Sequence, residues 1–334
     1  AEQSLMPNVV KVETGFRTVL PGDGTTPDAT PASAPEVAML MGLAERADVI
    51  VDFSSLPAGT TRVRMINTAP DAPFGGFPDI PADPSTTGQV MEFALIADTP
   101  VGEEFTAPED LVLSLPDATD PAANGVVFSG ARDMALIEEE SIQVCASVRP
   151  NGSISYDQKG IPDLLNPGTC VDKKGKLLSS VPFAPKAAVL GINGSVGDTI
   201  NLWSDPIETQ PALGDTETWE LWNWTVDGHP IHLHLVKFKV VNREAFDPLT
   251  GALSGVVNPP EATELGWKDT VISYPGEVTR VNATFDIPGL YVWHCHIVEH
   301  EDNEMMVPYC VKNADGTRSI ACDVADGKIA PQVP

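Results

Sequence analysis

Residues 290–306, with the sequence LYVWHCHIVEHEDNEMM, combine a strand-like apolar run with three histidines, one cysteine and two methionines. Successive side chains of a β-strand point to opposite faces of the sheet. If residues 290–297 form a strand, His294 and His296 face one side and Cys295 faces the other. The stretch therefore predicts a sheet that carries potential metal ligands on both of its faces.

A second histidine motif, HPIHLH, occupies residues 229–234, and the two motifs contain all six histidines of the 334-residue chain. Histidine is the commonest metal ligand in proteins. By the same alternation His232 and His234 share one face of their strand. If the two strands are neighbours, four imidazoles converge on one side, and Cys295 serves a separate site about 10 Å away. The spacing predicts a protein with more than one transition-metal centre, and we expect the metal to be copper.

The rest of the chain favours an all-β fold. The 27 glycines and 31 prolines indicate many turns, and short alternating segments are typical of a Greek-key β-sandwich or barrel. The other segments that predict strands are 47–53, 61–66, 89–97, 219–224, 231–241, 270–273 and 277–285. The chain contains no apolar run of the length that a membrane helix needs, about 18 residues or more, so no membrane span is expected.

We expect three parts in the chain. Residues 1–100 form a partial domain, residues 101–182 form a connector with short strands, and residues 183–334 form the domain that carries the ligand motifs. The strand signal is sharpest in the third part. The length of the chain, 334 residues, corresponds to about two domains of ordinary size, which fits this division.

Charge and cysteine content narrow the function classes. A formal net charge of −27 argues against nucleic-acid binding, because phosphates would be repelled. Of five cysteines, Cys295 belongs to the ligand motif. The other four allow three pairings, and short separations favour Cys145 with Cys170 and Cys310 with Cys322, although four reduced thiols are the alternative. Two disulfides would place the protein in an oxidising compartment, either periplasmic or extracellular.

One metal site has a recognisable ligand set. Cys295, His300 and Met305 follow the spacing Cys-x4-His-x4-Met, and His229 supplies a second imidazole. Two imidazoles, a thiolate and a weak axial thioether are the ligands of a blue electron-transfer copper. Met306 competes for the axial position. Zinc is the main rival metal, but it does not favour a thioether, and structural zinc sites more often use several cysteines.

The motifs His-Pro-x-His-x-His and His-Cys-His-x3-His-x4-Met resemble the carboxyl-terminal copper motifs of the multicopper oxidases, most of all the spore-coat laccase, bilirubin oxidase and phenoxazinone synthase branch. Residues 43–53 also resemble part of the second cupredoxin domain of that branch. The resemblance is strong from about residue 183 to residue 310 and weaker before that. It implies cupredoxin-like domains and four copper ions in the complete enzyme.

The resemblance also implies a role for each ligand. The type 1 copper ligands would be His229, Cys295, His300 and Met305, the type 2 copper would bind His232, and the type 3 pair would bind His234, His294 and His296. Substrate would lose single electrons at type 1 copper, and Cys295 with its flanking histidines would carry them to a trinuclear cluster that reduces O2 to water. Glu301 matches an acidic residue that delivers protons in that branch, and a solvated or capping carboxylate is the alternative.

Two departures from the family pattern matter. The family's cluster uses eight histidines, four of them from an amino-terminal portion, and this chain has none before His229. We expect that portion on a second chain or a proteolytic fragment, which makes the enzyme a heteromer. The family branch also suggests a tryptophan before His229, where Asp227 and Gly228 stand, so tuning of the site like that of bilirubin oxidase is not expected.

The sequence therefore predicts a laccase-like oxidase that acts on phenols or related small reducing substrates, with O2 as acceptor. Two alternatives remain. A blue-copper electron-transfer protein would use the type 1 site alone, and a metallo-oxidase would oxidise Mn(II), Cu(I) or Fe(II) by the same mechanism. Met-rich segments, which mark the family's cuprous oxidases, are not evident among the eight methionines.

Overall fold

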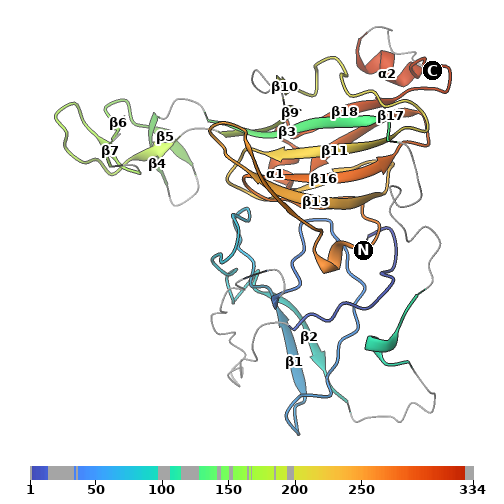
Figure 1. Cartoon of the computed structure of the whole chain (residues 1–334). Coiled ribbons are helices and arrows are strands. Elements are labelled where there is room, and N and C mark those ends of the chain that lie inside the picture. The colour runs from blue at the N-terminus through green and yellow to red at the C-terminus, as the bar shows by residue number, and fades with distance from the viewer. Residues whose placement is uncertain are drawn as a thin grey trace, which may run out of the picture.

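A computed structural model of the chain describes residues 2–13, 34, 37–96, 106–113, 128–140, 144–149, 153–163, 165–166, 168–183, 186–193 and 199–327. Within these ranges strands joined by loops predominate, and the helices are short. The expected all-β class is confirmed. Two sheets form the main body of the molecule, and smaller sheets lie outside it (Figure 1).

The larger sheet has seven strands. In spatial order they are β10 (Thr199–Asn201), β9 (Lys186–Ile192), β3 (Gly130–Glu140), β11 (Thr216–Asn223), β16 (Glu277–Thr284), β13 (Phe238–Phe246) and β14 (Leu253–Asn258). The central strand β11 runs parallel to β3 and antiparallel to β16. Its TETWELWN sequence is buried along most of its length, because neighbours cover both of its edges and the core covers its inner face.

The smaller sheet brings the two histidine motifs together. Its four strands, in spatial order, are β15 (Thr270–Ser273), β12 (His229–Leu233), β17 (Gly289–Cys295) and β18 (Met306–Val311). The antiparallel register of β12 and β17 sets His232 opposite His294 and Ile231 opposite Cys295. Residues opposite each other in an antiparallel pair lie on the same face. The register therefore places one histidine of each motif side by side.

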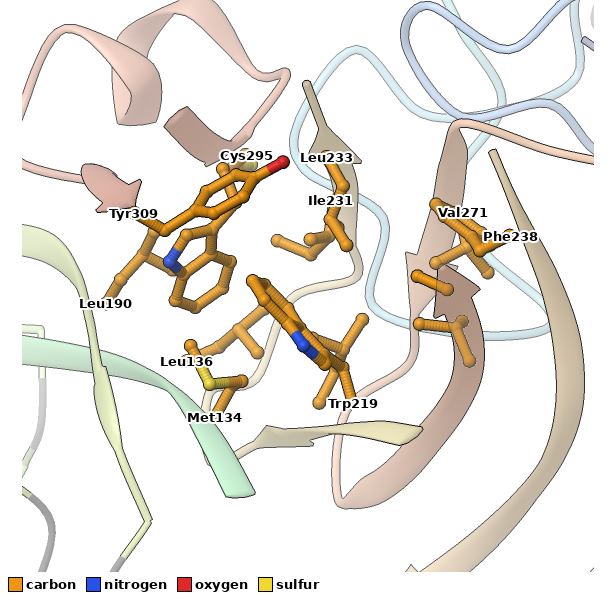
Figure 2. Close-up of a cluster of buried hydrophobic side chains, with 14 of the residues drawn as sticks. Met134, Leu136, Leu190, Trp219, Ile231, Leu233, Phe238, Val271, Cys295 and Tyr309 are labelled. Carbon is orange, nitrogen blue, oxygen red and sulfur yellow. The ribbon is translucent and has the colours of Figure 1, made fainter. Parts of the chain in front are cut away.

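The hydrophobic core lies between the two sheets. Trp219 of the larger sheet meets Trp293 of the smaller sheet edge to face, with ring centroids 5.9 Å apart. The rings of Phe285 and Tyr309 also pack against the Trp219 indole, each with a centroid separation of 5.7 Å. Cys295 belongs to the same buried cluster (Figure 2). Each fully buried side chain of this size contributes about 1.5–3 kcal/mol, so this core holds rigidly the strands that carry the motifs.

The remaining elements surround this body. A two-stranded sheet of β1 (Arg62–Ile66) and β2 (Gln89–Ala94) lies in the amino-terminal part. A projecting lobe, visible at the left of Figure 1, contains β4 (Val144–Val148), β5 (Ile154–Tyr156), β6 (Ile161–Pro162), β7 (Cys170–Val171) and β8 (Val181–Phe183). The short helices are η2 (Pro108–Asp110), η4 (Ala262–Glu264), α1 (Val298–Glu301) and α2 (Ile320–Ala325).

The favoured disulfide pairing is confirmed. Cys145 pairs with Cys170 inside the lobe, and Cys310 pairs with Cys322, which ties β18 to α2. Cys295 is the free cysteine of the described residues, and it is buried. None of the described helices has both the length and the apolar character needed to cross a bilayer.

Two of the predicted strands are wrong in detail. Residues 47–53 form no strand: the side chains of Val49, Ile50 and Val51 are exposed, and no strand in the described part of the chain pairs with this segment. The predicted strand 231–241 is two strands, β12 and β13, because Leu235 has a φ of 72° and the chain crosses there between the sheets. The crossing lets Leu233 and Phe238 enter one core from opposite sheets. Residue 97, the predicted end of β2, lies outside the described residues.

The three-part division of the chain stays a prediction. Strand β3 bears on it, because this strand lies within the predicted connector and yet pairs with both β9 and β11 of the larger sheet. Residues 130–140 therefore contribute to the sandwich that carries the ligand motifs. The boundaries at residues 100 and 182 remain our proposal for the organisation of the chain. The two-sheet sandwich itself has the cupredoxin-like architecture that the motifs imply.

Candidate metal centre

Three side chains from three elements form the first potential metal site. His229 begins β12, Cys295 ends β17 and His300 lies in α1. The Cys295 Sγ lies 3.6 Å from His229 Nδ1 and 3.9 Å from His300 Nδ1, and the two nitrogens are 3.3 Å apart. Metal–nitrogen bonds of about 2.0 Å and metal–sulfur bonds of about 2.3 Å place three trigonal donors about 3.5–3.8 Å apart. The observed triangle therefore fits a transition-metal ion.

Hydrogen bonds fix which nitrogen of His229 faces the sulfur. The Thr225 hydroxyl lies 2.7 Å from His229 Nε2, and this hydroxyl donates its proton to Asn223 Oδ1 at 2.8 Å. The Asp227 carbonyl at 3.0 Å is a second acceptor for this hydroxyl, so the arrangement favours donation from His229 Nε2–H to the threonine oxygen, which leaves the lone pair on Nδ1. The Ile297 amide points toward the Cys295 sulfur at 3.5 Å and stabilises negative charge on it. These partners orient the donors before any ion is present.

Burial sets the protonation of the three donors. It lowers the pKa of His229 to about 3 and lowers the pKa of His300 below its ordinary value. Both imidazoles are consequently neutral at pH 7, the form that binds metals. Burial also raises the pKa of the Cys295 thiol to about 12. A bound cation would displace that proton, because coordinated thiols are deprotonated outright.

The two methionines after α1 differ in burial. Met305 is completely buried, and its carbonyl accepts a hydrogen bond from the Cys295 amide at 3.1 Å. Its own amide donates to the His300 carbonyl, also at 3.1 Å. Met306 is half-buried and pairs with His294 across β17 and β18. The structure thus ties Met305 by its backbone to two members of the triangle and sets Met306 beside the other histidine group.

The other four histidines form a second group on the opposite side of β17. Its members are His232, His234, His294 and His296. The separations between neighbouring ring centroids run from 4.9 Å for His294 and His296 to 5.6 Å for His232 and His296. His234 Nε2 and His294 Nε2 are 3.3 Å apart. Four imidazoles at this spacing can share one or more metal ions.

Backbone carbonyls orient two rings of this group. His232 Nδ1 donates to the Asp269 carbonyl at 2.8 Å, and His294 Nδ1 donates to the Cys295 carbonyl at 3.0 Å. Each ring therefore presents the lone pair of Nε2. Burial lowers the pKa of His232 to about 4 and also lowers the pKa values of His234 and His294. Neutral rings with one nitrogen already committed are prepared metal ligands.

Glu301, the predicted proton carrier, lies at the edge of the histidine group. Its Oε2 is 3.4 Å from His294 Nδ1 and 3.7 Å from His296 Nδ1, and its side chain is half-buried. As the last residue of α1 it follows His300 directly, so one short helix serves both potential sites. The carboxylate is within reach of the imidazoles and of solvent, which is the position that a proton carrier needs.

The structure brings the six predicted histidines and Cys295 together in these two groups and ties Met305 to the first group through its backbone, and the role of each residue remains a proposal. Sequence reasoning missed the residues that orient the rings, Thr225 and Asp269. Thr225 lies four residues before His229, and Asp269 lies just before β15. Neither position stands out by composition. The nearest signal is the register of β12 with β15, which sets His232 opposite Thr270.

Comparison with known proteins agrees with the motifs. Residues 186–315 match the sequence profile of the multicopper oxidases. A laccase of Bacillus subtilis is 50% identical over 113 residues, which make up 32% of this chain and 22% of the laccase. The Oryza sativa protein named multicopper oxidase LPR1 homolog 3 is 30% identical over 329 residues, 88% of this chain and 53% of the relative.

A solved structure of a Campylobacter jejuni multicopper oxidase, described as a metallo-oxidase, is 21% identical with a TM-score of 0.36, and the match covers 63% of this chain and 34% of that one. The chain thus spans only part of the length of each relative. Both potential metal sites lie within the residues that match the family profile. This part of the chain is similar to the multicopper oxidases over the whole matched stretch, residues 186–315.

Proposed function

We propose that this chain is the carboxyl-terminal portion of a laccase-like oxidase, which removes single electrons from phenols or related small aromatics and reduces O2 to water. The first site would hold a type 1 copper through His229, Cys295, His300 and Met305. The second group would supply His232 to a type 2 copper and His234, His294 and His296 to a type 3 pair. Copper bound there would supply the one-electron redox steps and O2 reduction.

The observation that carries this proposal is the position of Cys295 between the two groups. Its sulfur belongs to the first triangle, while the residues on either side of it, His294 and His296, belong to the four-imidazole group. A single peptide segment thus connects a site suited to one-electron chemistry with a site suited to several metal ions. An isolated electron carrier needs only the first site and has no use for the second.

The four-imidazole group is open on one side, which supports completion by ligands from elsewhere. His294 is buried, but the His234 side chain is exposed and that of His296 is 33% exposed. We expect four further histidines from an amino-terminal portion on a second chain or fragment, which would give four copper ions in the complete enzyme. Glu301, between the exposed side and His294, would carry protons to the oxygen that is reduced there.

Charge and disulfides support a setting for this activity. A net charge of −27 disfavours nucleic acid and suits a protein that gathers cations near its surface. The two disulfides support an oxidising location, periplasmic or extracellular. Manganese, cuprous and ferrous ions are the alternative reducing substrates, and they would use the same two sites.

Two substitutions test the proposal on the preparation as isolated. Cys295→Ser should abolish the blue thiolate-to-copper absorption and phenol oxidation together. His232→Ala should leave the blue absorption unchanged and abolish O2 consumption. Copper per chain and a mass spectrum of the intact preparation accompany both, because they show whether a histidine-bearing companion is present.

The outcomes separate the candidate functions. A blue protein that consumes no O2 with phenols or with Mn(II), Cu(I) or Fe(II), even with its companion present, would be an electron-transfer protein. O2 consumption with the metal ions alone would make it a metallo-oxidase. A preparation with one zinc ion and no copper would contradict the proposal altogether.

A further inference from the structure

The His232 ring is held by a backbone carbonyl whose own position depends on distant parts of the chain. The Asp269 carbonyl accepts two hydrogen bonds from β12, one from His232 Nδ1 at 2.8 Å and one from the Leu233 amide at 3.1 Å. This carbonyl directs the His232 ring, because the nitrogen that donates to it cannot bind a metal. Its placement decides where the Nε2 lone pair points.

The Asp269 carboxylate is clamped from three directions. Arg46 donates two parallel hydrogen bonds, from Nη1 to Oδ1 at 2.9 Å and from Nη2 to Oδ2 at 2.8 Å. Gln3 donates to Oδ2 at 2.5 Å, and the Thr270 hydroxyl donates to Oδ1 at 3.0 Å. The forked contact of a guanidinium with a carboxylate fixes orientation as well as position. Asp269 is therefore held at a defined angle by residues more than 200 positions away in sequence.

The residue before Asp269 is anchored by the same two distant segments. Lys268 is buried, and its Nζ lies 2.8 Å from a carboxylate oxygen of Glu2 and 2.8 Å from one of Glu45. The backbone amide of Gln3 also donates to the Trp267 carbonyl at 3.0 Å. Residues 2–4 and 42–46 thus contact residues 267–269 from outside the sandwich. Both segments do so through hydrogen bonds and ion pairs.

A tight turn delivers Arg46 to this position. The Gly42 amide donates to Glu45 Oε2 at 2.7 Å, and Ala44 adopts a φ of 65°. Gly42 lies so close to the smaller sheet that a β-carbon on it would be 2.8 Å from Ile272 Cγ1 and 3.1 Å from Pro230 Cβ. The turn therefore packs directly on β12 and β15, the strands that carry His232 and follow Asp269.

We propose that Arg46 is a positioning residue for His232, acting through Asp269 to hold the ring in the tautomer that presents Nε2 to the metal cluster. The proposal rests on the proposed function insofar as it takes His232 as a cluster ligand. The ring contact itself does not require a metal. Arg46 is half exposed, so its pair with Asp269 contributes little to stability. Its geometric effect on the carbonyl is the larger consequence.

The first test measures the His232 tautomer in the metal-free chain. With only six histidines, selective 15N labelling resolves each ring, and His232→Ala assigns the signal. At a pH where the rings are neutral, the intact chain should show His232 protonated on Nδ1. Arg46→Ala should give a mixture of both tautomers. Arg46→Lys should restore the charge but only part of the tautomer preference, because an ammonium lacks the fork.

The second test measures copper binding. Cu(II) competition against a chelator should show about 10-fold weaker binding to the four-imidazole group in Arg46→Ala, since loss of an orienting partner costs 10–100-fold in metal affinity. The blue absorption from the Cys295 site in the same sample is the internal control and should not change. The matched variant is Arg62→Ala, which loses an exposed pair with Glu92 in the same region and should alter neither measurement.

The outcomes distinguish the two proposals. An unchanged His232 tautomer in Arg46→Ala would overturn the positioning role, as would equal changes in Arg62→Ala. If the tautomer shifts but the intact chain binds no Cu(II) at the histidine group, the positioning role stands and the proposed function fails. Should Arg46→Ala not fold, Arg46→Lys decides the question, with a wild-type tautomer and wild-type Cu(II) affinity counting against the proposal.

Discussion

The buried pair of Arg243 and Glu264 supports a quantitative prediction about the strand next to the metal sites. Both guanidinium nitrogens Nη1 and Nη2 donate to the carboxylate at 2.6 Å, and the two side chains are 4% and 9% exposed. Arg243 also donates to the Ile272 carbonyl of β15 at 3.1 Å. The pair thus fastens β15, whose Ser273 is the register partner of His229.

Glu264→Gln should destabilise the chain by about 3–5 kcal/mol, the cost of breaking a buried ion pair and leaving one charge uncompensated. The glutamine keeps one acceptor for Arg243, so we expect the lower end of that range. Urea unfolding followed by tryptophan fluorescence measures the change, because all six tryptophans lie between residues 203 and 293. Adding Arg243→Met to this variant should recover much of the loss, since no unpaired charge then remains.

The matched control is Glu220→Gln. Its partner Arg280 is more exposed and keeps a second carboxylate, that of Glu244 at 3.0 Å. The control should cost about 1 kcal/mol or less. A loss below about 1 kcal/mol for Glu264→Gln would refute the reasoning from burial, and so would a double variant that is less stable than the single one.

The same pair predicts how stability depends on pH. Burial alone would raise the pKa of Glu264, but the hydrogen bonds and charge of Arg243 outweigh it, and the pKa lies below its ordinary value. A lowered folded-state pKa adds stability above the unfolded value of about 4.3 and loses it as the pH falls through the folded value. The stability difference between the parent chain and Glu264→Gln should therefore shrink below about pH 4, which urea midpoints at several pH values would show.

Three further predictions concern the metal centre and its support. Met305→Leu should raise the reduction potential of the blue site, because loss of the weak axial donor lowers the coordination number and Cu(I) tolerates fewer ligands than Cu(II), whereas Met306→Leu should leave the potential unchanged in a redox titration. Thr225→Val should weaken copper binding at the blue site about 10-fold in chelator competition, since it removes the acceptor for His229 Nε2–H. Gly42→Val should cost about 1–3 kcal/mol in urea unfolding, because its side chain would collide with the smaller sheet, and unchanged stability would show that the turn is not packed there.

Strand alternation was enough to predict much of the site from the sequence. Residues 294–296, at the end of β17 and just after it, carry ligands on alternate sides, and this pattern alone separates the sulfur site from the four-imidazole group. The all-β class followed from strand lengths and turns. The break at Leu235 could not be predicted, because residues 231–241 have apolar side chains suited to one long strand. Only the closure of two sheets around one core requires the crossing.

Residues 47–53 show the opposite failure. Their composition, ADVIVDF, is typical of a strand, but a strand also needs a neighbour that takes its hydrogen bonds, and β1 pairs only with β2 in the described part of the chain. The adjacent turn at residues 42–46 instead contacts β12 and β15 through side chains. Local propensity cannot distinguish these outcomes, because pairing depends on residues far away in sequence.

The choice of ring nitrogen shows where motif reasoning ends. Both motifs supply imidazoles, yet His229 faces the sulfur through Nδ1 because Thr225 takes its Nε2, whereas His232 presents Nε2 because the Asp269 carbonyl takes its Nδ1. The same residue type thus serves two kinds of site according to a partner that lies outside both motifs. Spacing determines which side chains meet, and hydrogen bonds from neighbouring loops determine which atoms can bind a metal. For His232 the proposed set of orienting contacts extends through Asp269 to Arg46, so the orientation of this ring would depend on a turn more than 180 residues away in the sequence.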